Sequence, residues 1–271
     1  MLTIEYDVRE DQPERTQVVR LDTSSPALIE ALLRRRYSHL SQVDARTIAN
    51  ASGGNARIAI ALAETVDRSD SISGLSDEAL FQRLFRQRQD SDNALLLAAQ
   101  MCALVYSFQG AALTGDQAEL PRLAALAGQA PGETYRYVQE LLRRDLVQQR
   151  GPWRAVLPHA IANRLAARAL EDTPYDLIDQ QLVSGGTERL AKSFSRRLSF
   201  LHDQPAAVAI VERWLAPGGL LHDVSALSDL GRAMFHNVAP VLPEAALSAL
   251  ERVAVSRPHL AATVWRQHLS L

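Results

Sequence analysis

The sequence predicts a mainly α-helical protein with a few short β segments. Three observations carry this prediction: amphipathic helical spacing over most of the chain, two short β-like runs around Gly151–Pro152, and regularly spaced Gly, Pro and Asp breaks beyond residue 173. The chain has 271 residues, of which 47% are apolar and 22% are charged. A chain of this kind can bury a large core, and its length fits roughly two domains.

Residues 1–22 have short β-like segments, and residues 23–74 then follow a helical pattern. A serine ahead of Pro26 is placed to cap the first helix, because proline is favoured at the first helical position. Two further helices are expected in this stretch, one over Val43–Ala51 and one that starts near Asn55.

The pattern is sharpest over residues 75–172, where four helices are expected and a β-hairpin follows the fourth. This order, with a tight helix-turn-helix directly before the hairpin, is typical of a winged helix, and we expect one here. The four helices are expected at about residues 76–88, 92–108, 117–127 and 131–144.

Over residues 173–271, helical segments alternate with breaks such as Ser184–Gly186 and Pro217–Gly219. The regular breaks predict paired helices of a superhelical repeat array, although no residue motif repeats strictly. The chain starts on strand-like residues and stops inside the helical pattern. We therefore expect it to be incomplete at both ends.

Composition excludes several classes of protein. A single cysteine, Cys102, rules out a disulfide framework and a multi-cysteine zinc site, and its apolar surroundings indicate a small buried side chain. His236, His259 and His268 show no metal-ligand spacing, so no metal site is expected. Neither a membrane span nor a signal peptide is evident, and we expect a cytoplasmic protein with no membrane partner.

Two segments can contact a phosphate. Gly53 and Gly54 lead into the helix that starts near Asn55, so Arg57 lies in its first turn, beside free N–H groups and the positive helix end. Amide donors and a guanidinium suit a bound anion, although a plain loop-to-helix junction has the same spacing. His159 opens a helix after the hairpin, where its imidazole can donate to an anion or serve as a packing or capping residue.

Taken together, the two segments resemble the regulatory half of the STAND NTPases, the signalling branch of the AAA+ class that includes bacterial antiviral sensors and NLR-type immune receptors. Gly53–Ala59 is similar to the lid motif of this family, which places Arg57 where a sensor-2 arginine stands. Leu157-Pro158-His159 is similar to the Met-His-Asp motif, and only its histidine is present, because Pro158 replaces the methionine and Ala160 replaces the acidic residue. The resemblance implies four parts: an ATPase-core remnant at 1–22, a helical lid at 23–74, a winged helix at 75–172 and the start of a helical sensor array at 173–271.

The resemblance also implies a nucleotide switch. Arg57 and His159 would contact the phosphates of ATP or ADP, held with Mg by an upstream P-loop core in cis, and Gly53, Gly54 and Asn55 would form the lid backbone. The C-terminal helices would bind an unknown protein ligand. The implied biology is signal transduction, with antiviral defence as one setting.

The chain itself lacks a P-loop and a Walker B motif. The nearest match to a P-loop is Gly186–Ser193, which has Ala191 where the motif needs glycine and contains Lys192, the single lysine of the chain. We therefore expect no enzymatic activity and no bound cofactor for this chain alone, and ATPase activity only in a longer parent protein.

Two other functions stay open. A winged helix is common in DNA-binding regulators, and the segment from Glu133 to Arg154 carries five arginines against three acidic residues. The formal charge of −2 argues against a strongly basic nucleic-acid protein. The arginines that would contact DNA are Arg136, Arg143, Arg144, Arg150 and Arg154. A helical adaptor that uses only protein contacts is the remaining alternative.

Overall fold

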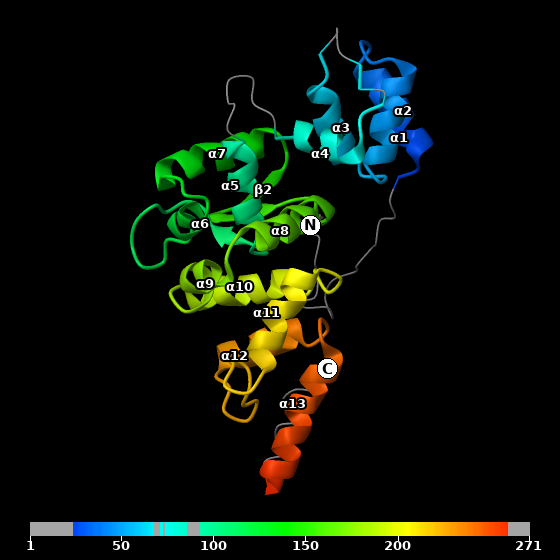
Figure 1. Ribbon diagram of the computed structural model, residues 1–271. Helices are drawn as coiled ribbons and strands as arrows, with labels where there is room; N and C mark the ends of the chain where they lie inside the picture. The colour runs from blue at the N-terminus through cyan, green and yellow to red at the C-terminus, as the bar shows by residue number, and fades with distance from the viewer. Residues whose placement is uncertain (1–23, 68–70, 73, 86–92, 260–271) are drawn as a thin grey trace, which may run out of the picture. The chain divides into compact units, whose positions relative to one another are not determined.

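The computed structural model describes residues 24–67, 71–72, 74–85 and 93–259 (Figure 1). These residues are mainly helical and include one small sheet, which confirms the predicted class. The chain divides into two compact units, Met1–Leu80 and Phe81–Leu271. The β segments expected within residues 1–22 lie outside the described residues.

Three helices of the first unit pack against one another. Each begins at a polar side chain that accepts a hydrogen bond from its first turn, namely Ser25, Ser41 and Asn55. The buried carboxylate of Asp44 accepts hydrogen bonds from Ser71 Oγ and Ile72 N, at 3.2 and 2.9 Å. The helices are α1 (Pro26–Arg36), α2 (Gln42–Ala51) and α3 (Ala56–Glu64), and the division between the units falls within α4 (Asp77–Arg83).

The second unit begins with helices around a three-stranded antiparallel sheet in the order β1-β3-β2. Phe108 of β1 pairs with Arg154, and Val147 of β2 pairs with Val156, while Gly151 turns the β2–β3 hairpin with φ +56°. The elements are α5 (Ala94–Ala103), β1 (Phe108–Gln109), α6 (Leu120–Leu126), α7 (Pro131–Arg143), β2 (Val147–Arg150), β3 (Trp153–Val156) and α8 (His159–Asp172).

The helix expected over 92–108 ends at Ala103, and the expectation that it reaches residue 108 was wrong. Tertiary hydrogen bonds replace the helical ones beyond that point. Tyr106 N donates to Ser193 O at 3.0 Å, and Gln109 N donates to a carboxylate oxygen of Glu119 at 2.6 Å.

In the described residues that follow α8, the second unit continues as helices joined by loops, along the yellow-green to red part of the chain (Figure 1). α10 packs on α12, and α11 packs on both α8 and α13. Thr187 caps α10, because its Oγ1 accepts a hydrogen bond from Leu190 N at 3.0 Å. The elements are α9 (Tyr175–Ile178), the π-helix η2 (Asp179–Val183), α10 (Glu188–Leu198), α11 (Pro205–Leu215), α12 (Asp229–Val238) and α13 (Pro243–Ser256). No helix within the described ranges is both long and apolar enough to cross a lipid bilayer.

Candidate functional site

The glycine-rich segment ahead of α3 forms a tight loop in the first unit. Gly53 and Gly54 have φ values of +57° and +81°, which glycine adopts at little cost. Asn55 Oδ1 accepts hydrogen bonds from Arg57 N and Ile58 N at 3.0 and 3.2 Å. These two amides are therefore satisfied within the loop, and an anion at this helix start would rely mainly on the half-buried Arg57 side chain.

His159 is the first residue of α8 and follows the β2–β3 hairpin through a cis Leu157–Pro158 bond. Its half-buried ring lies nearly parallel to the rings of Tyr106 and Phe200, with centroid distances of 5.2 and 5.7 Å. Tyr106 comes from the segment between α5 and β1, and Phe200 follows α10. Two segments from elsewhere in the second unit therefore flank the imidazole.

Two arginines of α10 flank the same tyrosine. The Cζ atom of Arg196 lies 4.1 Å from the centre of the Tyr106 ring, and that of Arg197 lies 5.7 Å from it. Arg197 is fully buried, and its Nε and Nη1 donate to Ala103 O and Asn163 Oδ1, at 3.0 and 2.5 Å. Burial lowers the pKa of Arg197 to about 10, which still leaves it charged at neutral pH.

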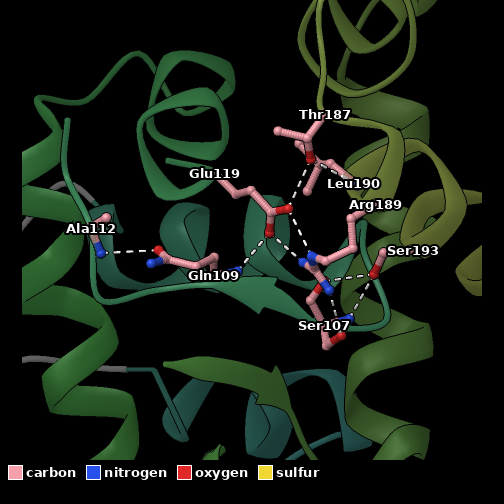
Figure 2. Close-up of polar contacts among 8 residues, drawn as sticks. All are labelled: Ser107, Gln109, Ala112, Glu119, Thr187, Arg189, Leu190 and Ser193. Atoms are coloured by element: carbon pink, nitrogen blue, oxygen red, sulfur yellow. Dashed lines mark hydrogen bonds and ion pairs between the residues drawn. The ribbon is translucent and has the colours of Figure 1, made fainter. Parts of the chain in front are cut away.

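A polar network fixes α10 against the sheet (Figure 2). The buried Glu119 carboxylate accepts hydrogen bonds from Gln109 N on one side, and from Thr187 Oγ1 and Arg189 Nε on the other, the last two at 2.9 and 2.8 Å. Arg189 Nη2 also donates to the carbonyl oxygen of Ser107 at 2.9 Å. The network therefore sets the position of the α10 arginines relative to Tyr106.

The five arginines of the DNA-binding alternative differ in their surroundings. Arg136, Arg143 and Arg150 are exposed. Arg144 donates to Glu140 at 2.8 Å and to Leu84 O at 2.9 Å. Arg154 is buried, and its Nη1 donates to the carbonyl oxygens of Gly151 and Trp153 at 2.8 and 3.0 Å. The last two side chains would have to leave these partners to reach a phosphate backbone.

The sequence-predicted phosphate contacts lie in different units, Arg57 in the first and His159 in the second.

The P-loop-like segment at Gly186 follows the helical turns of α9 and η2, and Lys192 is exposed on α10. Among the described residues, no group of His, Cys, Asp and Glu side chains is arranged to hold a metal ion.

Sequence reasoning missed Tyr106, Arg196, Arg197 and Phe200. The signal that could have found Arg197 is its place on the apolar face of α10, three residues after Phe194 and seven after Leu190. A charge at such a position needs an explanation.

Comparisons with protein-family models, with curated proteins and with solved structures find no match to this chain.

Proposed function

We propose that the chain is the lid, winged-helix and start-of-sensor portion of a STAND-type signalling ATPase, and that it works as a nucleotide-dependent switch rather than as an enzyme. The observation that carries this proposal is the placement of His159. It occupies the first position of α8 directly after the hairpin, and Tyr106 and Phe200 hold its half-buried ring. The Met-His-Asp-like motif would present its histidine from this place.

The order of elements in the second unit supports the winged-helix part of the proposal. Helix α5, strand β1, helices α6 and α7, the β2–β3 hairpin and helix α8 follow one another as the parts of a winged helix do. Helices α9–α13 then supply the start of the sensor array, whose partner would be a protein ligand.

In the parent protein, a P-loop core would hold ATP or ADP with Mg, and the lid and winged helix would respond to the state of the nucleotide. Arg57 would contact the phosphates from the lid and His159 from the start of α8. A ligand that binds one arrangement of these parts more tightly than another shifts the equilibrium between them. In this proposal the protein is cytoplasmic, and the signal belongs to a pathway such as antiviral defence.

The test is nucleotide affinity in a complex of this chain with a separately made STAND-type ATPase core. Arg57→Ala and His159→Ala should each weaken ADP binding roughly tenfold, because a charge-assisted hydrogen bond contributes about 1.5–3 kcal/mol. Arg136→Ala, which removes an exposed arginine of α7, is the matched control and should leave the affinity unchanged. Unchanged affinity in both Arg57→Ala and His159→Ala contradicts the proposal.

Binding to random duplex DNA separates the switch from the regulator. A DNA-binding protein retains duplex at low ionic strength and releases it as salt rises, because phosphate contacts dominate its affinity. The switch proposal expects no such retention in a gel-shift experiment, and retention abolished by Arg136→Ala together with Arg143→Ala would overturn it.

A further inference from the structure

A cavity of about 410 Å³ lies in the second unit, among the helices that follow α8. This volume is in the range of sites that hold small organic molecules. Its wall comes from α9, η2, the first turn of α10, the end of α11 with the loop after it, and α12. The wall is mainly apolar, and its larger apolar side chains are Val183, Trp214, Leu220, Leu230 and Met234. Trp214 and Met234 are buried whereas Leu220 is 52% exposed, so solvent reaches part of the wall.

Hydrogen bonds in the cavity wall lead to a carboxylate. Trp214 Nε1 donates to the Tyr175 hydroxyl at 2.8 Å, and that hydroxyl donates to Asp179 Oδ1 at 3.2 Å. The indole and the phenol therefore use their donors within the wall, and Asp179 keeps acceptor capacity. Within the described parts of the chain, no cation pairs with this half-buried carboxylate.

Arg213 brings a positive charge to the same tyrosine and also lines the cavity. Its Cζ lies 4.3 Å from the centre of the Tyr175 ring. It forms an ion pair with Asp176 at 3.6 Å, in which the two side chains are 59% and 93% exposed, so solvent weakens the pair. Arg213 and Asp179 thus place opposite charges beside one ring without neutralising each other.

We propose that this cavity binds an apolar α-amino acid. At neutral pH such a molecule carries an ammonium and a carboxylate on one carbon, next to an apolar side chain. Asp179 accepts hydrogen bonds from the ammonium, Arg213 donates to the carboxylate, and the apolar wall covers the side chain. The ligand needs two opposite charges that lie close together but are not paired with each other, and Asp179 and Arg213 meet this need.

The backbone at Asp179 supports a binding role. Asp179 is the first residue of the π-helix η2, and its carbonyl oxygen accepts a hydrogen bond from Ser184 N at 2.9 Å. Turns of π-helix are rare and occur frequently at functional sites. Asp179 and Val183, at the two ends of η2, both line the cavity. One short element therefore supplies the carboxylate together with part of the apolar wall.

The amino-acid site does not depend on the proposed function. Every residue that lines the cavity belongs to the second unit, and neither Arg57 nor His159 is among them. The chain is therefore tested without nucleotide and without an ATPase core. Failure of the switch proposal leaves this one unaffected, and failure of this one leaves the switch proposal unaffected.

Isothermal titration calorimetry of the full chain with L-phenylalanine, L-leucine and L-tryptophan tests the site. We expect saturable binding of one equivalent of at least one of them. Asp179→Asn and Arg213→Gln should each weaken it about tenfold or more, because each removes a charge-assisted hydrogen bond. Asparagine still offers Tyr175 an acceptor and Arg213 is exposed, so both variants should fold.

Two variants control for the loss of charge alone. Glu212→Gln on α11 and Lys192→Gln on α10 remove exposed charges from residues that do not line the cavity, and both should leave the affinity unchanged. No saturable binding of the three amino acids overturns the proposal. So does a loss in the two control variants that equals the loss in Asp179→Asn and Arg213→Gln.

Compounds that lack one part of the ligand test each contact separately. Phenethylamine has no carboxylate and 3-phenylpropionate has no ammonium, so each should bind about tenfold more weakly than L-phenylalanine. Arg213→Gln should not weaken phenethylamine further, and Asp179→Asn should not weaken 3-phenylpropionate further. Glycine, which has both charges and no apolar side chain, should bind more weakly than all three amino acids. If either half-compound binds as tightly as L-phenylalanine, the site does not recognise an amino acid and the proposal fails.

Discussion

Arg189 on α10 binds the buried carboxylate of Glu119, which lies 70 residues earlier in the chain, through both Nε and Nη2. Glu119 is 2% exposed and the Arg189 side chain is 33% exposed. The same guanidinium lies over the Trp153 ring, with its Cζ 4.3 Å from the ring centre. One pair of residues thus connects the start of α6, the hairpin and the first turn of α10.

Glu119→Gln should lower the free energy of unfolding by about 2 kcal/mol. Breaking a buried pair costs about 3–5 kcal/mol, and the partial exposure of Arg189 reduces that figure. Urea denaturation measures the change. The matched control is Arg168→Gln, which removes an exposed ion pair with Asp172 and should cost less than about 1 kcal/mol. Equal losses in the two variants would show that burial adds nothing to the Glu119 pair.

Cys102 should be inert in the folded protein. It is fully buried on α5, and burial raises the pKa of its thiol to about 12, so almost no reactive thiolate forms near neutral pH. A chromogenic disulfide reagent at pH 8 should react slowly with the native chain and completely in urea. Val255→Cys adds a thiol at a position that is 84% exposed, and one extra equivalent should then react at once. Rapid reaction of the native wild type would contradict the buried placement.

Tyr37 should ionise late in an alkaline titration. Burial and the hydrogen bond that its hydroxyl donates to Glu64, at 2.9 Å, raise the pKa of Tyr37 from 10.0 to about 12. Between these values the unfolded chain loses the proton and the folded chain keeps it. The stabilisation is therefore complete below pH 10 and is lost as the pH rises toward 12.

Ultraviolet absorbance of tyrosinate measures the effect. Tyr37→Phe should remove a late step from the titration, and Glu64→Gln should move that step to lower pH because the carboxylate no longer disfavours the phenolate. A titration curve that is the same in wild type and Glu64→Gln would argue against the contact.

Gly219 should not tolerate a side chain. A Cβ there would lie 2.2 Å from Arg213 O and 2.6 Å from Trp214 O, and both are backbone atoms that cannot rotate away. We expect Gly219→Ala to lower the free energy of unfolding by roughly 1–3 kcal/mol. Gly132, within α7, has nothing within 4 Å of its added Cβ, so Gly132→Ala should stabilise by about 0.5–1 kcal/mol. Thermal melting compares the two variants, and the opposite order of melting temperatures would refute the argument.

Turn residues and helix caps were enough to predict many elements of the fold. The hairpin around Gly151–Pro152 and the helix expected over Val43–Ala51 are present, the latter beginning one residue earlier, at Gln42. Thr187, a residue type favoured at helix N-caps, caps α10. These features depend on turn residues and caps within a few positions of one another, which is the range over which a single sequence carries information.

Features that depend on distant partners could not be found in this way. Phe108 lies in a strand because Arg154 pairs with it, and the chain turns before it because Ser193 binds the backbone of Tyr106. The cluster of Tyr106 with Arg196 likewise joins residues from either side of the hairpin. No spacing pattern in the sequence predicts this contact, although an arginine on the apolar face of α10 indicates that a partner lies nearby.

The shortness of β1 makes the sheet sensitive to α10. Only Phe108 and Gln109 form this edge strand, and the two residues before it are hydrogen-bonded to Ser193. Displacing α10 would pull on the strand, and a two-residue ladder offers little resistance to separation. The Gln109 amide is bound to Glu119, which Thr187 and Arg189 at the start of α10 also bind, so its hydrogen exchange, compared with that of Ala155 within the hairpin, would follow the position of α10. A displacement of α10 should therefore change the edge of the sheet before it changes the buried core.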